Sequence, residues 1–384
     1  MSSSRALGSI CLLLLLQVPL TAEMPTTAVK QMTTEEHIAK PGWWPRKGDA
    51  PKSDYVGTAA CAECHSGLVK SQQQHAMSHA AAPTKVTDVK DPIHFSAGTA
   101  QYSITPEGNR LVYKVQYNAQ SFSAPLEWTF GSGTHGQTFL YHRNGDWWET
   151  HITTFNVIGA DVTPGESDAP PTSLTGALGR WVTDEELPQC FGCHTVAAVT
   201  EGKFDPASAV PGISCEGCHG PGAAHVALAH AGVGAKPGMV FNPSTLDPAS
   251  SLDFCGACHR TWWDVAQMDN PGIKVVRFPA YRLEQSRCWG NGDARLTCIA
   301  CHNPHQPLVR DISAYDQKCL SCHVKSASVK RSADHPGAAC PVKSSNCASC
   351  HMPKYEVPQT HSRFTDHRIR VVRHPGEIPT RWDD

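Results

Sequence analysis

Cys215-Glu-Gly-Cys218-His219-Gly-Pro-Gly-Ala-Ala-His225 is the stretch that decides how this chain folds. Its first five residues are one copy of Cys-x-x-Cys-His, and the 384 residues contain seven such copies. The paired cysteines are Cys61 and Cys64, Cys190 and Cys193, Cys215 and Cys218, Cys255 and Cys258, Cys298 and Cys301, Cys319 and Cys322, and Cys347 and Cys350. The histidines that follow them are His65, His194, His219, His259, His302, His323 and His351. These copies use fourteen of the seventeen cysteines, so the repeat organises the chain.

The spacing within each copy indicates covalent haem attachment. Two thiols three positions apart on one helical turn can each form a thioether with a haem vinyl group, and the next histidine then reaches the iron as proximal ligand. A neutral imidazole is a good iron ligand near pH 7. Zinc half-sites and disulfide frameworks also use paired cysteines, but neither needs a histidine after every pair. The sequence therefore predicts seven covalently bound haem c groups.

Fourteen further histidines are available as second, distal ligands of the irons. His225 follows the third copy, and His305 follows His302 too closely to reach the far face of the same iron. His135 lies in a glycine-rich loop, where backbone can approach a ring closely. We expect distal ligands at His79, His135, His225, His305, His335, His361 and His367, with His75 and Met77 as alternatives near the first copy. We rank His37, His94, His142, His151, His230 and His374 below them.

The close spacing of the copies after Cys190 indicates short helices joined by loops rich in proline and glycine. Such segments cannot build a protein core, so haem must fill the interior, and the haem-free chain should not fold stably. We therefore predict a mainly α multihaem scaffold with extensive loops. The expected segments are a signal peptide over 1–22, an N-terminal segment with the first motif over 23–92, a strand-rich insertion over 93–180 and a six-haem domain over 181–384.

Alternating apolar residues predict a small antiparallel sheet near residues 99–155. The expected strands are 101–105, 110–117, 126–130, 137–142 and 147–153, with turns at Gly108-Asn109 and Asn144-Gly145. Two functions stay open for this insertion. It either packs over haem as a structural element or serves as a docking or oligomer surface.

The first residues resemble a signal peptide, with Arg5 before an apolar run and Ala22 at the expected cleavage site. We therefore expect export to the periplasm, with an extracellular or membrane-associated location as alternatives and no transmembrane segment after cleavage. Removal of Arg5 leaves a net charge of about −3, which argues against nucleic acid as a partner. An acidic holoprotein suits basic redox partner proteins, whose identity as donor or acceptor the sequence does not give.

Two cysteines remain outside the copies and the signal peptide. Cys288 and Cys340 either form a disulfide, which an oxidising compartment favours, or are buried thiols. The segment from His361 to His374 is rich in arginine. Its arginines either neutralise haem propionates or form a docking patch.

The same residues resemble the multihaem cytochromes related to cytochrome c-554. The likeness runs from about Tyr55 to Val372 and rests on several strings. They are 55–65, Gly131-Ser-Gly-Thr-His135-Gly, 215–225, Ser286-Arg-Cys288, 298–305, Cys347-Ala-Ser-Cys-His-Met-Pro353 and Phe364-Thr-Asp-His-Arg-Ile-Arg370. The resemblance implies a mostly helical scaffold with stacked and perpendicular haem pairs, a periplasmic location and electron transfer. It also implies His79, His135, His225, His305 and His367 as distal ligands, although the carriers that name the family have four motifs and this chain has seven.

These observations favour an electron carrier whose irons each hold two histidines, because such iron has no open site for a substrate. The alternatives are a multihaem oxidoreductase acting on a small nitrogen or sulfur compound at one open haem, and a filament of stacked haems. Nitrite reductase relatives use Cys-x-x-Cys-Lys at the catalytic haem, and this string does not occur here.

Overall fold

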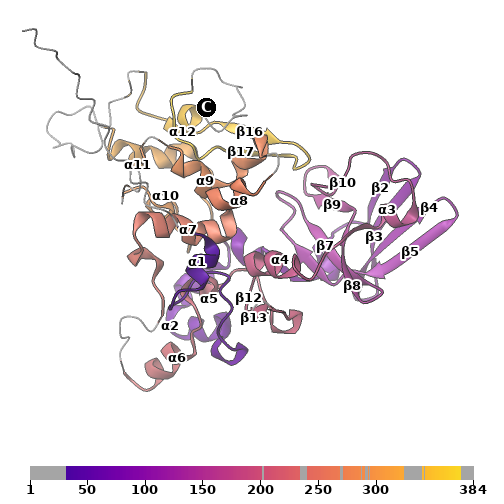
Figure 1. Cartoon of the computed structure of the whole chain (residues 1–384), viewed down its shortest axis with the longest axis horizontal. Coiled ribbons are helices and arrows are strands. Elements are labelled where there is room, and N and C mark those ends of the chain that lie inside the picture. Colours follow the sequence, from indigo (N-terminus) through magenta and orange to yellow (C-terminus); the bar gives the residue numbers. More distant parts are fainter. Residues whose placement is uncertain are drawn as a thin grey trace, which may run out of the picture. The chain divides into compact units, whose positions relative to one another are not determined.

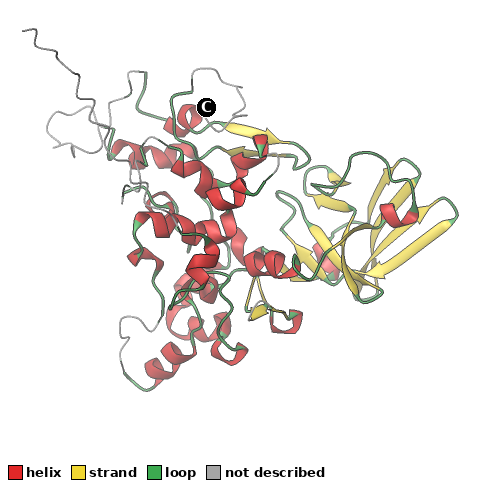
Figure 2. Ribbon diagram, in the orientation of Figure 1, coloured by secondary structure: helices red, strands yellow, loops and turns green. Residues whose placement is uncertain are grey.

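The computed structural model describes residues 32–200, 203–233, 240–268, 271–286, 288–289, 293, 295–323, 340 and 342–372. The predicted signal peptide, His335 and His374 lie outside these ranges. Helices and strands both make up large parts of the chain, and most strands gather in one region (Figure 2). About 35% of the described residues are helical and 23% are in strands. The prediction of a mainly α fold is therefore wrong.

The main reason is the segment between the first two motifs, which forms more strands than alternation alone suggested. Its first sheet is antiparallel, in the order β2 (Ile93–Ala97), β3 (Ala100–Glu107), β4 (Arg110–Tyr117) and β5 (Gln120–Pro125). Alternate residues of these strands point into a core, as Tyr102 and Tyr113 do. Tight turns connect the strands, with positive φ at Gly98, Gly108 and Asn118.

A second sheet packs face to face with the first, so the single sheet expected near residues 99–155 is a two-sheet sandwich. Its strand order is β1 (Ala81–Pro83), β6 (Trp128–Phe130), β7 (Thr138–Arg143), β8 (Asp146–Thr150) and β11 (Gly179–Trp181). Phe139 and Tyr141 of β7 join the core of the first sheet. Leu140, which points the other way, joins Trp128 and Trp147 in a cluster against Phe191 of α4 (Leu187–His194). The sandwich therefore anchors the helix of the second motif.

All seven motifs lie on or at the end of helices, most of them short (Figure 1). In chain order these are α2 (Gly57–Gln72), α4, α5 (Cys215–His219), α7 (Pro248–His259), α10 (Cys298–Cys301), α11 (Asp316–Leu320) and α12 (Cys347–His351). A helical turn brings residues i and i+3 to one side. Both cysteines of each pair can therefore face one haem edge.

The other elements are short and connect the motifs. The helices are α1 (Thr34–Ile38), α3 (Leu174–Ala177), α6 (Ala223–His230), α8 (Trp262–Ala266) and α9 (Pro279–Glu284). Single 3-10 turns are η1 (Lys52–Asp54), η2 (Ala76–His79), η3 (Val86–Asp88), η4 (Pro206–Ser208), η5 (Pro243–Thr245), η6 (Gly272–Arg277) and η7 (Ile312–Tyr315). The strand pairs are β9 (Ile152–Phe155) with β10 (Gly159–Val162), β12 (Thr195–Val196) with β15 (Val210–Pro211), β13 (Val199–Thr200) with β14 (Lys203–Phe204), and β16 (Lys354–Val357) with β17 (Ser362–Thr365).

Within the described ranges, no helix combines the length and apolarity needed to cross a membrane. The domain boundaries at 22/23, 92/93 and 180/181 stay predictions.

Candidate haem centres

Three pairs of imidazole rings face each other at the distance expected for two ligands of one iron. An imidazole nitrogen binds a first-row metal at about 2.0–2.1 Å and the ring centre lies roughly 1 Å further out, so two opposed rings are about 6 Å apart. The ring centroids of His65 and His225 are 6.5 Å apart, with their planes at 18°. Those of His219 and His305 are 6.0 Å apart at 4°. Each pair joins a motif histidine to a predicted distal ligand.

The third pair, His302 and His367, has centroids 6.2 Å apart with planes at 48°. Burial, with smaller effects from neighbouring groups, lowers the pKa of His367 to about 4. Burial also lowers the pKa of His302. Both rings are therefore neutral near pH 7, which is the form that ligates a metal.

Carbonyl oxygens fix the tautomer of several motif histidines. Nδ1 of His194 lies 3.0 Å from the Ala80 oxygen, and Nδ1 of His351 lies 2.8 Å from the Arg370 oxygen. The same contact joins Nδ1 of His219 to the Phe241 oxygen at 2.8 Å, and Nδ1 of His367 to the Thr365 oxygen at 3.0 Å. A carbonyl can only accept, so each Nδ1 carries the proton and each Nε2 keeps its lone pair for a metal. These residues fit the haem ligation that the motifs predict.

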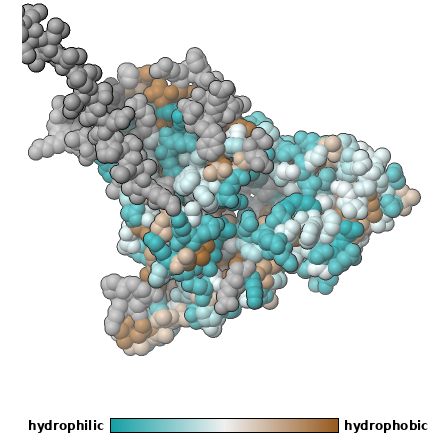
Figure 3. Space-filling view, in the orientation of Figure 1, coloured by the Kyte–Doolittle hydropathy of each residue, from teal (hydrophilic) through white to brown (hydrophobic). Residues whose placement is uncertain are grey.

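The helix that carries His225 also fits a haem. No residue of α6 is buried by protein, although Val226 and Leu228 are apolar. Apolar atoms are visible at the surface over α6 (Figure 3). A haem on His225 would cover this apolar side.

The two histidines near the first motif differ in burial, and the order is the reverse of their ranking from the sequence. His79 is exposed at the end of η2, whereas His75 is half-buried and interacts electrostatically with His259 and His302. The Met77 amide donates to His75 Nδ1 at 3.0 Å, so the proton of a neutral His75 lies on Nε2. This tautomer does not suit ligation through Nε2. Nothing in the residues around them distinguishes these two histidines.

His135 and His361 lie close together at the β16–β17 hairpin. His135 Nδ1 is 2.9 Å from Ser362 Oγ, which leaves its Nε2 available. Nε2 of His361 is instead 2.7 Å from Asp161 Oδ2, and its ring packs edge-on against Phe155. The described contacts bring neither ring opposite a motif histidine.

Three histidines that the sequence ranked lower have carboxylate neighbours on the surface or in the core. His37 Nε2 is 3.4 Å from Asp253, His142 Nδ1 is 2.6 Å from Glu127, and His230 Nε2 is 3.4 Å from Glu63.

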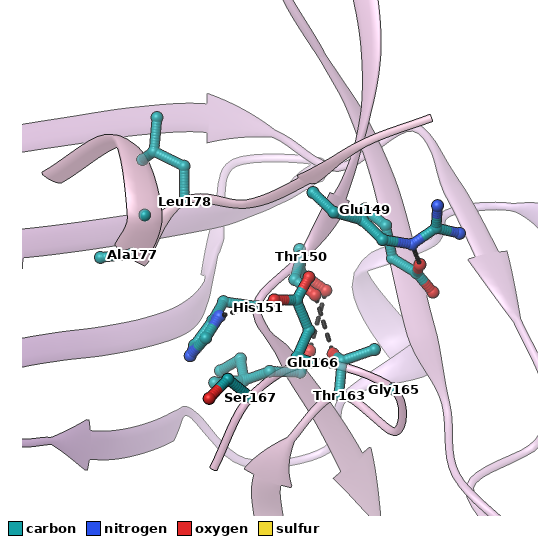
Figure 4. A network of polar contacts seen from close by, with 12 residues as sticks. Glu149, Thr150, His151, Thr163, Gly165, Glu166, Ser167, Ala177 and Leu178 are labelled. Atoms are coloured by element: carbon teal, nitrogen blue, oxygen red, sulfur yellow. Dashed lines mark hydrogen bonds and ion pairs between the residues drawn. The ribbon is translucent and has the colours of Figure 1, made fainter. Parts of the chain in front are cut away.

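His151 is 3% exposed inside the sandwich, with Nδ1 3.6 Å from Glu166 Oε2 (Figure 4). Its ring stacks on Tyr102 at 5.4 Å. It is therefore part of the β-sandwich core and lies among strands rather than motifs.

Cysteines of different motifs lie close enough to interact electrostatically, which links the motifs in space. These interactions join the first motif to the third, the second to the fourth, the fourth to the fifth and the sixth to the seventh. The pairs are Cys61 with Cys215, Cys193 with Cys258, Cys255 with Cys298, and Cys319 with Cys347. Cys218 interacts electrostatically with Cys255 and Cys258, and Cys301 with Cys319. All seven motifs therefore form one connected, branched series.

Cys288 belongs to the same neighbourhood. Burial raises the pKa of its thiol, with smaller effects from Cys322 and Cys301. Cys288 and Cys340 are both half-buried, and their pairing stays a prediction.

Residues 173–220, which contain the second and third motifs, match the family described as cytochrome c554 and c-prime. This match supports a c-type cytochrome and covers two of the seven motifs. The resemblance found in the sequence is thereby confirmed. A cytochrome of this family implies covalently bound haem c and redox partner proteins.

No curated protein sequence matches the cytochrome. One similar solved structure is the outer cell wall cytochrome OcwA, at 18% identity and a TM-score of 0.32. The match covers 54% of this cytochrome and 37% of that chain. A likeness this low shows neither a shared arrangement nor a shared activity.

Proposed function

We propose that this cytochrome is an exported heptahaem electron carrier, located in the periplasm or outside the cell. The observation that carries the proposal is the connected series of motif cysteines. Electron exchange between haems needs cofactors close together, and haems attached to these neighbouring cysteines would lie near one another. The series runs from the first motif to the third and fourth, then through the fifth and sixth to the seventh, with the second joined to the fourth.

The proposed ligands follow from the facing rings. His225 pairs with His65, His305 with His219, and His367 with His302, and each pair would hold one haem iron. Four irons remain, those of His194, His259, His323 and His351. We propose that their second ligands are His79, His135, His335 and His361. We propose His79 ahead of His75, because the Met77 amide occupies Nδ1 of His75 and the proton of the neutral ring lies on Nε2.

Haem c supplies one-electron iron chemistry when bound. The polypeptide contributes two fixed imidazoles per iron, which hold the coordination constant between oxidation states and keep substrates from the metal. The carbonyls on Nδ1 of His194, His219 and His351 would make these three imidazoles stronger donors and lower the potential of their irons. The sandwich supports the second motif through Phe191. The centroid of its ring is 4.9 Å from that of Trp128 and 5.0 Å from that of Phe130.

Intact-mass spectrometry combined with reductive titration tests this function. We expect a chain that begins after Ala22, carries seven haem groups and takes up seven electrons. Reduced protein should be reoxidised by a partner cytochrome and should not turn over nitrite or hydroxylamine. Fewer than seven haems, or steady turnover of either compound, would contradict the proposal.

A further inference from the structure

Glu216 is a variable residue of the third motif, yet its side chain lies deep in the protein. Only 2% of the residue is exposed. Its Oε1 accepts hydrogen bonds from the amides of Val56 at 2.9 Å and Gly222 at 2.8 Å. Its Oε2 accepts from the Gly57 amide at 2.9 Å. Three amide donors compensate for burying a carboxylate, which is otherwise costly.

The three amides belong to the first turns of two helices. Val56 precedes α2, Gly57 is its first residue, and Gly222 precedes α6. Neither helix receives a hydrogen bond from the side chain of its own N-cap residue. The Glu216 carboxylate therefore caps both helices, and its charge suits the positive end of each helix dipole.

These helices carry the two facing rings of one centre. His65 is on α2, and His225 is on α6, with 6.5 Å between the ring centroids. The approach is close, because a Cβ on Gly222 would lie 3.0 Å from Val56 Cγ2 and 3.2 Å from Glu216 Oε1. An alanine at position 222 would therefore press on both Val56 and the carboxylate, and these side chains would have to shift by a few tenths of an ångström.

We propose that Glu216 is a positioning residue for the iron of the first motif, although it belongs to the third. By holding the first turns of α2 and α6 on one carboxylate, it fixes the spacing of His65 and His225. This inference rests on the proposed function, since it assumes a haem between these rings.

The matched control is Glu63, a variable residue of the first motif whose side chain is 58% exposed. Its one described ion pair is with His230 at 3.4 Å. Glu63→Gln removes the same charge and an exposed α2–α6 ion pair, which contributes little, while the amides at both helix starts keep their partner.

The test uses the full-length holoprotein and carbon monoxide binding to the reduced form. Iron with two firm histidines resists carbon monoxide, whereas His225→Ala should bind about one equivalent per chain. We expect Glu216→Ala to approach that value and Glu216→Gln to fall between it and wild type. The glutamine oxygen can still accept from the amides of Val56 and Gly222, but its NH2 group would meet the Gly57 N–H, and two donors cannot bond to each other. Glu63→Gln should bind as little as wild type.

The double variant Glu216→Ala/His225→Ala separates positioning from general damage. It should bind no more carbon monoxide than His225→Ala alone, since both changes act on one iron. Gly222→Ala provides a second route with the carboxylate intact and should also expose about one iron. Wild-type binding levels in both Glu216→Ala and Gly222→Ala, or additive binding in the double variant, would overturn the inference. If wild type carries seven haems and Glu216→Ala binds no more carbon monoxide than wild type, only the inference is rejected. If wild type lacks the first haem, the proposed function is rejected.

Discussion

His302 faces His367 across 6.2 Å, although the two residues belong to segments at different ends of the C-terminal half. The other facing pairs follow the same rule. His225 lies after the third motif and faces the first, and His305 lies after the fifth motif and faces the third. Each of these centres therefore joins two motifs. Loss of one haem should loosen two segments of the chain.

His367→Met should raise the potential of one centre. Methionine stabilises ferrous iron relative to histidine, so we expect one of seven potentials to move up by roughly 100 mV. Spectroelectrochemical titration measures the shift. His230→Asn, at an exposed histidine paired with Glu63, should leave all potentials in place. Seven unchanged potentials in His367→Met would show that His367 is not a ligand.

The residue before His367 forms a buried ion pair that should be essential for stability. Asp366 is fully buried and binds Arg282 through both oxygens, at 2.8 and 2.9 Å, and Arg370 at 2.6 Å. Burial alone would raise the pKa of Asp366, but Arg282 and Arg370 hold it below its usual value. Arg370 is thus engaged by a carboxylate of its own segment.

Asp366→Ala should cost about 3–5 kcal/mol, because two arginines lose their buried partner. Denaturant unfolding of the holoprotein measures this cost. Asp161→Ala, at the partly exposed partner of His361, is the control and should cost less than about 1 kcal/mol. A loss below that value in Asp366→Ala would show that the pair contributes little.

Asp253 should make the protein less stable as pH rises. Burial, with added repulsion from Glu284 and Asp247, raises the pKa of Asp253 to about 8. Between its unfolded pKa of about 4 and this value, the folded chain holds one proton more than the unfolded chain. The free energy of unfolding therefore falls with pH, by roughly 1 kcal/mol per unit.

Asp253→Asn removes this proton. We expect similar stability to wild type at pH 5 and higher stability than wild type at pH 8, measured by denaturant unfolding at both values. An identical pH dependence in the two proteins would mean that Asp253 ionises normally.

The β-sandwich should keep its structure without haem, whereas the motif helices should not. The sandwich core contains fully buried Tyr113, Phe139 and Leu111, none of them in a motif. Haem-free protein should show strand but little helix signal by circular dichroism, and limited proteolysis should leave a fragment of about 80–182. If proteolysis of the haem-free protein leaves no resistant fragment, the sandwich also depends on haem.

The parts of the fold that depend on local sequence could be predicted. The seven motifs lie on or at the end of helices, and the alternation over 110–117 matches β4. The sheet pairing could not be predicted, because β1 pairs with β6 and β8 with β11 over long separations. Strand pairs of two residues, such as β12 with β15, have no alternation to detect.

The candidate site shows the same division. Motif spacing alone identifies the attachment cysteines and proximal histidines. Which histidine serves as the second ligand of an iron depends on residues far away in the sequence. Asp161, for example, binds His361. Glu216 gave no signal beyond its place in the third motif, because its role comes from amides at Val56 and Gly222.

Low-temperature electron paramagnetic resonance of the oxidised holoprotein, quantified against iron, tests the central claim that every iron is closed by two histidines. We expect seven low-spin irons. Near-parallel rings at 4° and 18° should give two rhombic signals, and the twisted pair His302–His367 at 48° should give a larger maximal g value. Ring planes set the splitting of the iron orbitals, so the signals report these angles. A high-spin iron that shifts when nitrite or hydroxylamine is added would contradict the account and indicate an enzyme.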